Sequence, residues 1–127
     1  WTALRIFNVY GPGCAASLVN RLTDGSRPTL LVTPGFVRDY VHVDDVADAF
    51  VRAFAVTGGG VYNVGSGRAT TNAQLHELAP TGGYVAGGEP DADFWTYSVA
   101  DTARVREFLG WRARHSVLDW MQNSAPN

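Results

Sequence analysis

The chain has 127 residues, 46% of them hydrophobic, and a formal net charge of -2. This length makes one domain or a piece of one, and the small charge excludes a basic surface for nucleic acid or for a membrane. One cysteine and three scattered histidines predict neither a disulfide framework nor a metal site, and these features together predict a cytoplasmic protein.

The first part of the sequence predicts strands that alternate with helices. The apolar run 3–9 predicts a buried strand, because glycine and proline close it at 11–13. Helical spacing of apolar residues predicts a helix over 14–22. Two further strands are predicted over 29–33 and 37–43. The strand over 37–43 places Arg38, Tyr40 and His42 on one face and Asp39 and Val41 on the other.

A single apolar stripe predicts the next helix. Asp44 or Asp45 can cap it, and glycines stop it at 58–60. The stripe consists of Val46, Ala49, Phe50, Ala53 and Phe54. A buried strand over 61–64 and a glycine-containing loop follow, and Thr71 with Gln74 then forms the capping box of another helix.

The last third of the sequence predicts a loop and two short helices. Glycine and proline make 80–93 an irregular loop, with a brief strand at 84–86. Ser98 with Asp101 is expected to cap a helix that Gly110 ends. Ser116 with Asp119 repeats the capping pattern for the last helix. Strands that alternate with helices place the chain in the α/β class.

A glycine motif early in the chain resembles a dinucleotide-binding fingerprint in outline. Gly11-Pro-Gly-Cys-Ala-Ala16 has the spacing G-x-G-x-x-A after a predicted strand. The next strand ends in Val32-Thr33-Pro34-Gly35 and lacks the acidic residue that would hold the ribose. We therefore interpret the motif as a plain strand-to-helix turn.

Two polar residues at strand ends are candidates for ligand contacts. Arg38 can clamp a phosphate with its planar set of donors, or it can form an ion pair with an acid. Asp39, Asp44 and Asp48 are the acids within reach. Asn8 can contact a ligand or satisfy the backbone of a turn. The sequence alone leaves both pairs of alternatives open.

No set of residues has the pattern of a catalytic or metal-binding centre. His42, His76 and His115 have no mutual spacing typical of a metal site or a triad. The basic residues are all arginines, so no lysine can act as a base or a proton relay. The sequence predicts no catalytic residue and no metal ligand in this chain.

Four longer segments carry a family resemblance. They are Leu4-Arg-Ile-Phe-Asn-Val-Tyr-Gly-Pro-Gly13, Arg38-Asp-Tyr-Val-His-Val-Asp-Asp-Val-Ala47, Val61-Tyr-Asn-Val-Gly-Ser-Gly67 and Asp101-Thr-Ala-Arg-Val-Arg-Glu-Phe-Leu-Gly-Trp111. In this order they resemble the NAD-dependent epimerase/dehydratase family, extended short-chain dehydrogenases that act on nucleotide sugars. The second and fourth are similar to the family's R-D-[FY]-x-x-V-x-D-x-A and D-x-x-[KR]-x-x-x-x-L-G-[WY] segments. The resemblance covers nearly the whole chain.

The resemblance implies that residues 1–127 form the C-terminal portion of such an enzyme. This portion would comprise the last strands of a Rossmann-type sheet and most of a small substrate-binding lobe. The family's glycine-rich loop and catalytic Tyr-x-x-x-Lys would precede it, so an absent N-terminal part would bind most of NAD(P). Asn8 and Arg38 would bind the diphosphate of a nucleotide sugar. Phe7 and Val9 would lie near the nicotinamide, and the complete protein could be a homodimer.

One segment departs from the family pattern. Residues 87–93 carry acids where the family has a second phosphate-binding arginine, so the base and the sugar stay open. The implied reaction is an epimerisation, a dehydration or a reduction, and this chain alone would be inactive. Two alternatives stay open: a non-catalytic nucleotide- or protein-binding module of degenerate short-chain dehydrogenase fold, and a relative that reduces a non-sugar carbonyl.

Overall fold

The computed structural model describes residues 1–124 and confirms the α/β class. The strands are β1 (Thr2–Ile6), β2 (Asn8–Tyr10), β3 (Thr29–Leu30), β4 (Phe36–Arg38), β5 (Tyr40–His42), β6 (Gly60–Val64), β7 (Thr70–Thr71), β8 (Val85–Ala86) and β9 (Thr96–Ser98). The helices are α1 (Leu18–Thr23), α2 (Val43–Phe54), α3 (Asn72–Leu78), α4 (Ala103–Leu109) and α5 (Val117–Ser124). None of these helices is long and apolar enough to cross a membrane.

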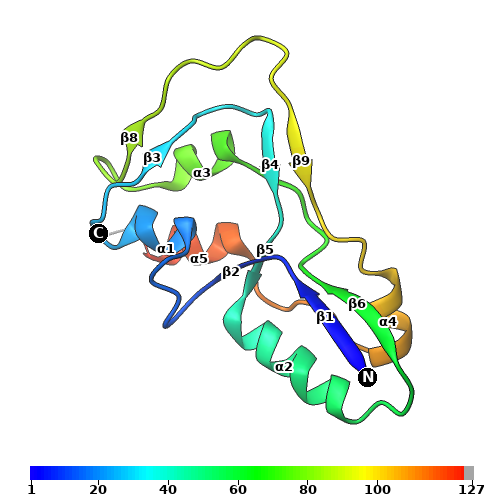
Figure 1. Ribbon diagram of the computed structural model, residues 1–127. Coiled ribbons are helices and arrows are strands. Elements are labelled where there is room, and N and C mark those ends of the chain that lie inside the picture. The colour runs from blue at the N-terminus through cyan, green and yellow to red at the C-terminus, as the bar shows by residue number, and fades with distance from the viewer. Residues whose placement is uncertain (125–127) are drawn as a thin grey trace.

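The strands form several short sheets instead of one continuous sheet. β1 pairs in parallel with β6, β2 with β5 and β3 with β8, while β4 lies between parallel β9 and antiparallel β7. In Figure 1 the β1–β6 pair lies at one end of the molecule with α2 and α4. The β3–β8 pair lies at the other end with α1, α3 and α5, and the β2–β5 pair lies between them.

The strand predicted over 3–9 is divided at Phe7, because the chain changes its pairing partner there. The Phe7 amide donates to the Val64 carbonyl at 3.0 Å, so it still follows the β1–β6 ladder. The next amide, that of Asn8, donates to the Asp39 carbonyl at 3.3 Å and begins the contacts with the second pair. Asn8 therefore lies where one parallel pair ends and the next begins.

The strand predicted over 37–43 is also two strands, and it breaks at Asp39. β4 pairs with β9 and β7, whereas β5 pairs with β2, so the two halves belong to different sheets. Arg38 and Tyr40 line one hollow across this break, and Tyr40 and Val41 pack into different cores. Tyr40, Val41 and His42 are all buried, while Arg38 is half-buried. The breaks at Phe7 and Asp39 place Asn8 and Arg38 at neighbouring strand junctions.

Each end of the molecule has its own hydrophobic core. The core between α1, α3 and α5 contains Tyr10, Val19, Leu22, Leu30, Tyr40, Leu75, Val117 and Met121. The core beside α2 and α4 contains Val41, Val46, Ala49, Tyr62, Val64, Val105, Leu109 and Trp111. β5 contributes to both cores, so it connects the two ends of the fold.

Three predicted helix starts are corrected by the structure. His42 caps α2 in place of Asp44 or Asp45, because its Nδ1 accepts the Asp44 amide at 3.1 Å. α1 begins at Leu18 and not at position 14, since the chain from 11 to 17 forms turns that include glycines of positive φ. Ser98 lies in β9, a strand that the sequence analysis missed, and does not cap α4.

The other end signals are confirmed. Thr71 and Gln74 form both hydrogen bonds of the predicted capping box. Gly110 ends α4 with a left-handed φ of 63°, a conformation that costs glycine little. The Ser116 hydroxyl accepts the Asp119 amide at 3.4 Å near the start of α5.

The apolar stripe of α2 is only partly buried. Val46 and Ala49 face the core, but Phe54 is 88% exposed. Phe50 and Phe54 line an apolar hollow of about 360 Å³ together with Thr2 and Leu4 of β1. Because β1 pairs only with β6 in the described chain, this face of α2 lies beside an open sheet edge.

Candidate functional site

Two hollows share Asn8 and Arg38 as lining residues. The first, of about 260 Å³, also involves Val9, Phe36 and Tyr40 and the residues that lead into α1. The second, of about 530 Å³, is lined by Arg5, Ile6, Phe7, Asn8, Arg38, Asn63 and Ser98. The structure therefore brings together all four predicted site residues, with Val9 on one side of the Asn8–Arg38 pair and Phe7 on the other.

Arg38 is held by neutral groups and not by an acid. Its Nη1 donates to the Val37 carbonyl at 2.8 Å, and its Nη2 donates to the Thr96 hydroxyl at 3.0 Å. The guanidinium also lies 4.3 Å from the centre of the Phe36 ring. Part of its donor set stays free for a ligand, since a guanidinium has more N–H groups than these two bonds use.

The ion-pair alternative for Arg38 is wrong within residues 1–124. Asp48 pairs with Arg52 at 3.1 Å, and Asp44 lies beside His42. The Asp39 carboxylate accepts hydrogen bonds from the 66–67 loop and from Ala100. The positive charge of Arg38 is therefore not neutralised by a carboxylate of the described chain.

The Asn8 side chain is exposed and makes no hydrogen bond within the described chain. The turn that follows it is satisfied by a different amide. Asn20 accepts the Gly11 amide at 3.0 Å and donates to the Gly11 carbonyl at 2.8 Å. Asn8 thus stays available for a ligand beside Arg38.

Tyr40 adds a neutral donor to the first hollow. Burial raises the pKa of Tyr40 to about 12, although the nearby Arg38 acts to lower it. The phenol is therefore protonated at neutral pH and can donate a hydrogen bond. The Asn8–Arg38–Tyr40 group presents positive charge and neutral polar groups, which suits an anion.

The loop Gly65-Ser66-Gly67 does not offer its amides to a phosphate. The Ser66 amide donates to Asp39 Oδ1 at 2.7 Å, and the Gly67 amide donates to Asp39 Oδ2 at 2.8 Å. An internal carboxylate thus occupies the donors that a phosphate-binding loop would need. The neighbouring Asn63 belongs to β6 and lines the second hollow.

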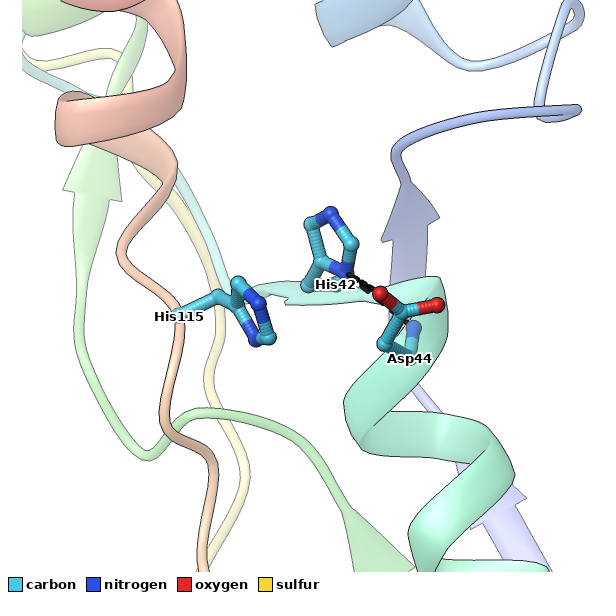
Figure 2. A group of neighbouring side chains, drawn as sticks. All are labelled: His42, Asp44 and His115. Carbon is cyan, nitrogen blue, oxygen red and sulfur yellow. Dashed lines mark hydrogen bonds and ion pairs between the residues drawn. The ribbon is translucent and has the colours of Figure 1, made fainter.

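A cluster that sequence reasoning missed lies at the start of α2. The His42 and His115 rings stack with centroids 4.0 Å apart and an interplanar angle of 14°. His42 Nδ1 lies 3.9 Å from Asp44 Oδ2, as Figure 2 shows. His115 Nδ1 lies 3.1 Å from an oxygen of the buried Asp45. No spacing signal could have revealed this cluster, because the two histidines come from segments far apart in the sequence.

The geometry of this cluster does not suit a metal centre, and its contacts instead fasten the segment at His115 to the start of α2. The lone pairs of an imidazole lie in the plane of its ring, so two stacked rings do not direct them to one point. His42 Nδ1 already accepts the Asp44 amide, and His115 Nδ1 is engaged with Asp45. Burial, and then the neighbouring His115, lower the pKa of His42, so this histidine is neutral at pH 7.

The acidic segment 87–93 borders a separate open hollow of about 550 Å³. Glu89, Asp91 and Asp93 line it together with residues 33–35 and the aromatic side chains of Phe94 and Trp95. This hollow shares no lining residue with the two around Arg38.

Comparison with known proteins gives a consistent set of relatives. Residues 1–65 match the model of the NAD dependent epimerase/dehydratase family. The UDP-glucose 4-epimerase of Mycolicibacterium smegmatis is 39% identical and matches 88% of this chain and 40% of its own length. The UDP-glucose 4-epimerase of Azospirillum brasilense is 34% identical and matches 96% of this chain and 43% of its own length.

Two solved structures are also similar to this chain. MoeE5 in complex with UDP-glucose and NAD is 29% identical, with a TM-score of 0.74 over 94% of this chain and 44% of that one. The UDP-glucose 4-epimerase of Thermotoga maritima with UDP-glucose is 31% identical, with a TM-score of 0.68 over 97% of this chain and 44% of that one. The chain spans less than half the length of each of these relatives.

Proposed function

The chain belongs to the NAD-dependent epimerase/dehydratase family, and we propose that it is the part of a UDP-sugar 4-epimerase that holds the diphosphate of the substrate. The observation that carries this proposal is the Arg38 guanidinium, which has no acidic partner in the described chain and lies between two hollows beside Asn8. The relatives named above are UDP-glucose 4-epimerases, or bind UDP-glucose and NAD.

The chemistry of a diphosphate fits this pair of hollows. Two phosphates that leave water need donors that are already fixed in place. Arg38 meets this need, because Val37, Thr96 and Phe36 hold its guanidinium before any ligand binds. A phosphate group at Arg38 and Asn8 would leave the nucleoside and the sugar in the hollows on the two sides.

The proposed cofactor is NAD, held mainly by residues outside this chain. Phe7 and Val9 line different hollows and both offer apolar surface, so the nicotinamide end would lie beside the hollow that takes the sugar, against one of these two residues. The backbone donors of Ser66 and Gly67 are occupied by Asp39, so that loop would not hold a pyrophosphate. When bound, NAD supplies the hydride acceptor, and the residues of this chain orient the substrate and exclude water.

The position within the complete protein is also a proposal. The order of the four family segments supports assignment of these residues to the C-terminal portion, and the lack of lysine agrees with a Tyr-x-x-x-Lys pair located elsewhere. The apolar hollow between α2 and the open edge of β1 would then pack against the remainder of the sheet.

Replacing Arg38 with alanine tests the diphosphate role. We expect Arg38→Ala to weaken the binding of UDP by about 1.5–3 kcal/mol, as for loss of a charged hydrogen bond, and to leave NAD affinity unchanged. Isothermal titration calorimetry of the full-length protein measures the affinities for UDP and for NAD. Arg112→Ala removes an exposed arginine that lines neither hollow and serves as the control. Equal UDP affinity in Arg38→Ala and wild type would refute the assignment.

A second measurement separates an epimerase from a non-catalytic binding module. The native-length protein is incubated with NAD and UDP-glucose, and the 4-epimer is followed by proton NMR. Conversion that Arg38→Ala slows supports the enzyme. UDP binding without any conversion supports the binding module.

A further inference from the structure

Asp39 is the most completely buried acid near the proposed diphosphate site, and it touches neither hollow. Its side chain is fully inaccessible, with a relative exposure of 0%. Oδ1 accepts the amide and the hydroxyl of Ser66, both at 2.7 Å. Oδ2 accepts the Gly67 amide at 2.8 Å and the Ala100 amide at 3.2 Å. Four donors therefore converge on one carboxylate.

Position 65 has no side chain, which leaves room for the Asp39 carboxylate. A Cβ on Gly65 would lie 2.7 Å from Asp39 Oδ2 and 2.7 Å from the Cβ of Ala100. Both distances are too short for any other residue, so Gly65 is required by close approach and not by its φ angle. The requirement for glycine at 65 follows directly from the position of the carboxylate.

Asp39 joins the segments that carry the proposed ligand contacts. It follows Arg38 directly, and its carbonyl accepts the amide of Asn8 at 3.3 Å. Its carboxylate also holds Ala100, two residues beyond Ser98, the β9 residue that pairs with Arg38. The backbone on either side of Arg38 and at Asn8 is thus tied to one buried group.

A side-chain anchor is needed here because the sheet is discontinuous. β4 and β5 belong to different sheets and meet at Asp39. Ladder hydrogen bonds therefore do not fix the angle between the strand that carries Arg38 and the β2–β5 pair that carries Asn8. The four hydrogen bonds to Asp39 replace the missing ladder at this point.

We propose that Asp39 is a positioning residue for ligand binding, which sets the separation of Asn8 and Arg38 from behind the site without touching the ligand. The inference rests on the proposed diphosphate role of these two residues. A looser anchor would let the two donors drift apart, and small misplacements in such sites cause large losses of affinity.

The test compares two buried acids. Asp39→Asn keeps the size of the side chain but places an amide N–H₂ against backbone donors. Asp45→Asn is the matched control, because Asp45 is also buried, with 3% exposure, and also accepts backbone amides, but lines neither hollow. We expect both variants to lower stability. We expect only Asp39→Asn to weaken UDP binding, by about tenfold, with Asp45→Asn within about twofold of wild type.

A double-mutant cycle with Arg38→Ala measures the coupling between Asp39 and Arg38 in UDP affinity, which a purely structural role of Asp39 would not produce. If Asp39 acts through Arg38, adding Asp39→Asn to Arg38→Ala changes UDP affinity by less than about twofold, instead of a further tenfold loss. Additive losses, or equal UDP affinity in Asp39→Asn and Asp45→Asn, would overturn the inference. If Arg38→Ala itself leaves UDP binding intact, the proposed function fails first, which is a distinguishable result.

A milder variant covers the case in which Asp39→Asn does not fold. Ser66→Ala removes the hydroxyl, which donates to Asp39 Oδ1 and accepts the Arg68 amide at 3.0 Å, and leaves the backbone donors to Asp39 in place. We expect a loss of about threefold in UDP affinity, since one of the four hydrogen bonds to Asp39 is lost. Wild-type affinity in a folded Ser66→Ala protein would overturn the inference.

Discussion

Asp45→Ala removes the group that fastens the C-terminal segment to the start of α2. The Asp45 carboxylate accepts the Arg114 amide at 3.1 Å and the His115 amide at 3.0 Å, and it lies 3.1 Å from His115 Nδ1. The Asp45 carbonyl also accepts Trp111 Nε1 at 2.9 Å, a contact that the substitution leaves in place. The perturbation therefore isolates the side-chain contacts.

The expected loss of stability follows from these contacts. Two backbone amides lose their acceptor, and each partly buried donor without a partner costs about 1–3 kcal/mol. The side-chain contact with His115 adds at most about 1 kcal/mol, because the His115 side chain is 44% exposed and water weakens the interaction. Since such terms are not additive, we expect a decrease of about 3 kcal/mol in the free energy of unfolding.

Urea denaturation followed by Trp fluorescence measures this decrease, since Trp111 is buried with 1% exposure. Asp44→Ala is the control, because its side chain is 73% exposed and contributes mainly to the charge at the helix N-terminus. The control should lose about 0.5 kcal/mol. A loss below about 1 kcal/mol for Asp45→Ala, or equal losses for the two variants, would refute the claim that the Asp45 side chain fastens the C-terminal segment to α2.

Two further predictions concern the same region. His42 has a pKa below its usual value of 6.5, mainly through burial and secondly through His115, so the unfolded chain binds more protons between that lowered pKa and pH 6.5. The contribution of His42 to the free energy of unfolding is therefore complete above pH 6.5, and it is lost as the pH drops toward the lowered pKa. Urea midpoints measured from pH 8 to 5 should fall less in His42→Asn than in wild type, and an equal fall in both proteins would contradict the prediction. Tyr10 is fully buried, and its hydroxyl has no hydrogen-bond partner within residues 1–124, so Tyr10→Phe should change the free energy of unfolding by less than about 1 kcal/mol. A loss above about 1.5 kcal/mol in urea denaturation would show that the hydroxyl has a partner.

Local features of the fold were predictable because neighbouring residues decide them. The capping box of Thr71 with Gln74 and the left-handed end of α4 at Gly110 need only residues within one helical turn. The strand over 61–64 was predictable for the same kind of reason, since a short apolar run between glycines buries itself in a parallel pair. The predicted caps of α2 and α4 were wrong, because residues chosen for them have other roles: Asp45 accepts the backbone amides at 114–115, and Ser98 belongs to β9.

The candidate site was predictable in its members but not in its construction. Asn8 and Arg38 were identified at strand ends, and the structure brings them to the same two hollows. The role of Asp39 was hidden, because its hydrogen-bond partners lie in the 66–67 loop and at Ala100. The stacked His42–His115 pair was hidden for the same reason, since its two halves come from distant segments.

The sequence by itself determined the α/β class, the helices with clear end signals and the family resemblance, all of which depend on order and local spacing. Only the tertiary structure decided that the predicted strands break at Phe7 and Asp39, because a strand ends where its hydrogen-bonding partner changes, and those partners are far away in the sequence. Those same breaks bring Asn8 beside Arg38 and bury Asp39 behind them, so the geometry of the site follows from long-range pairing that no local pattern encodes.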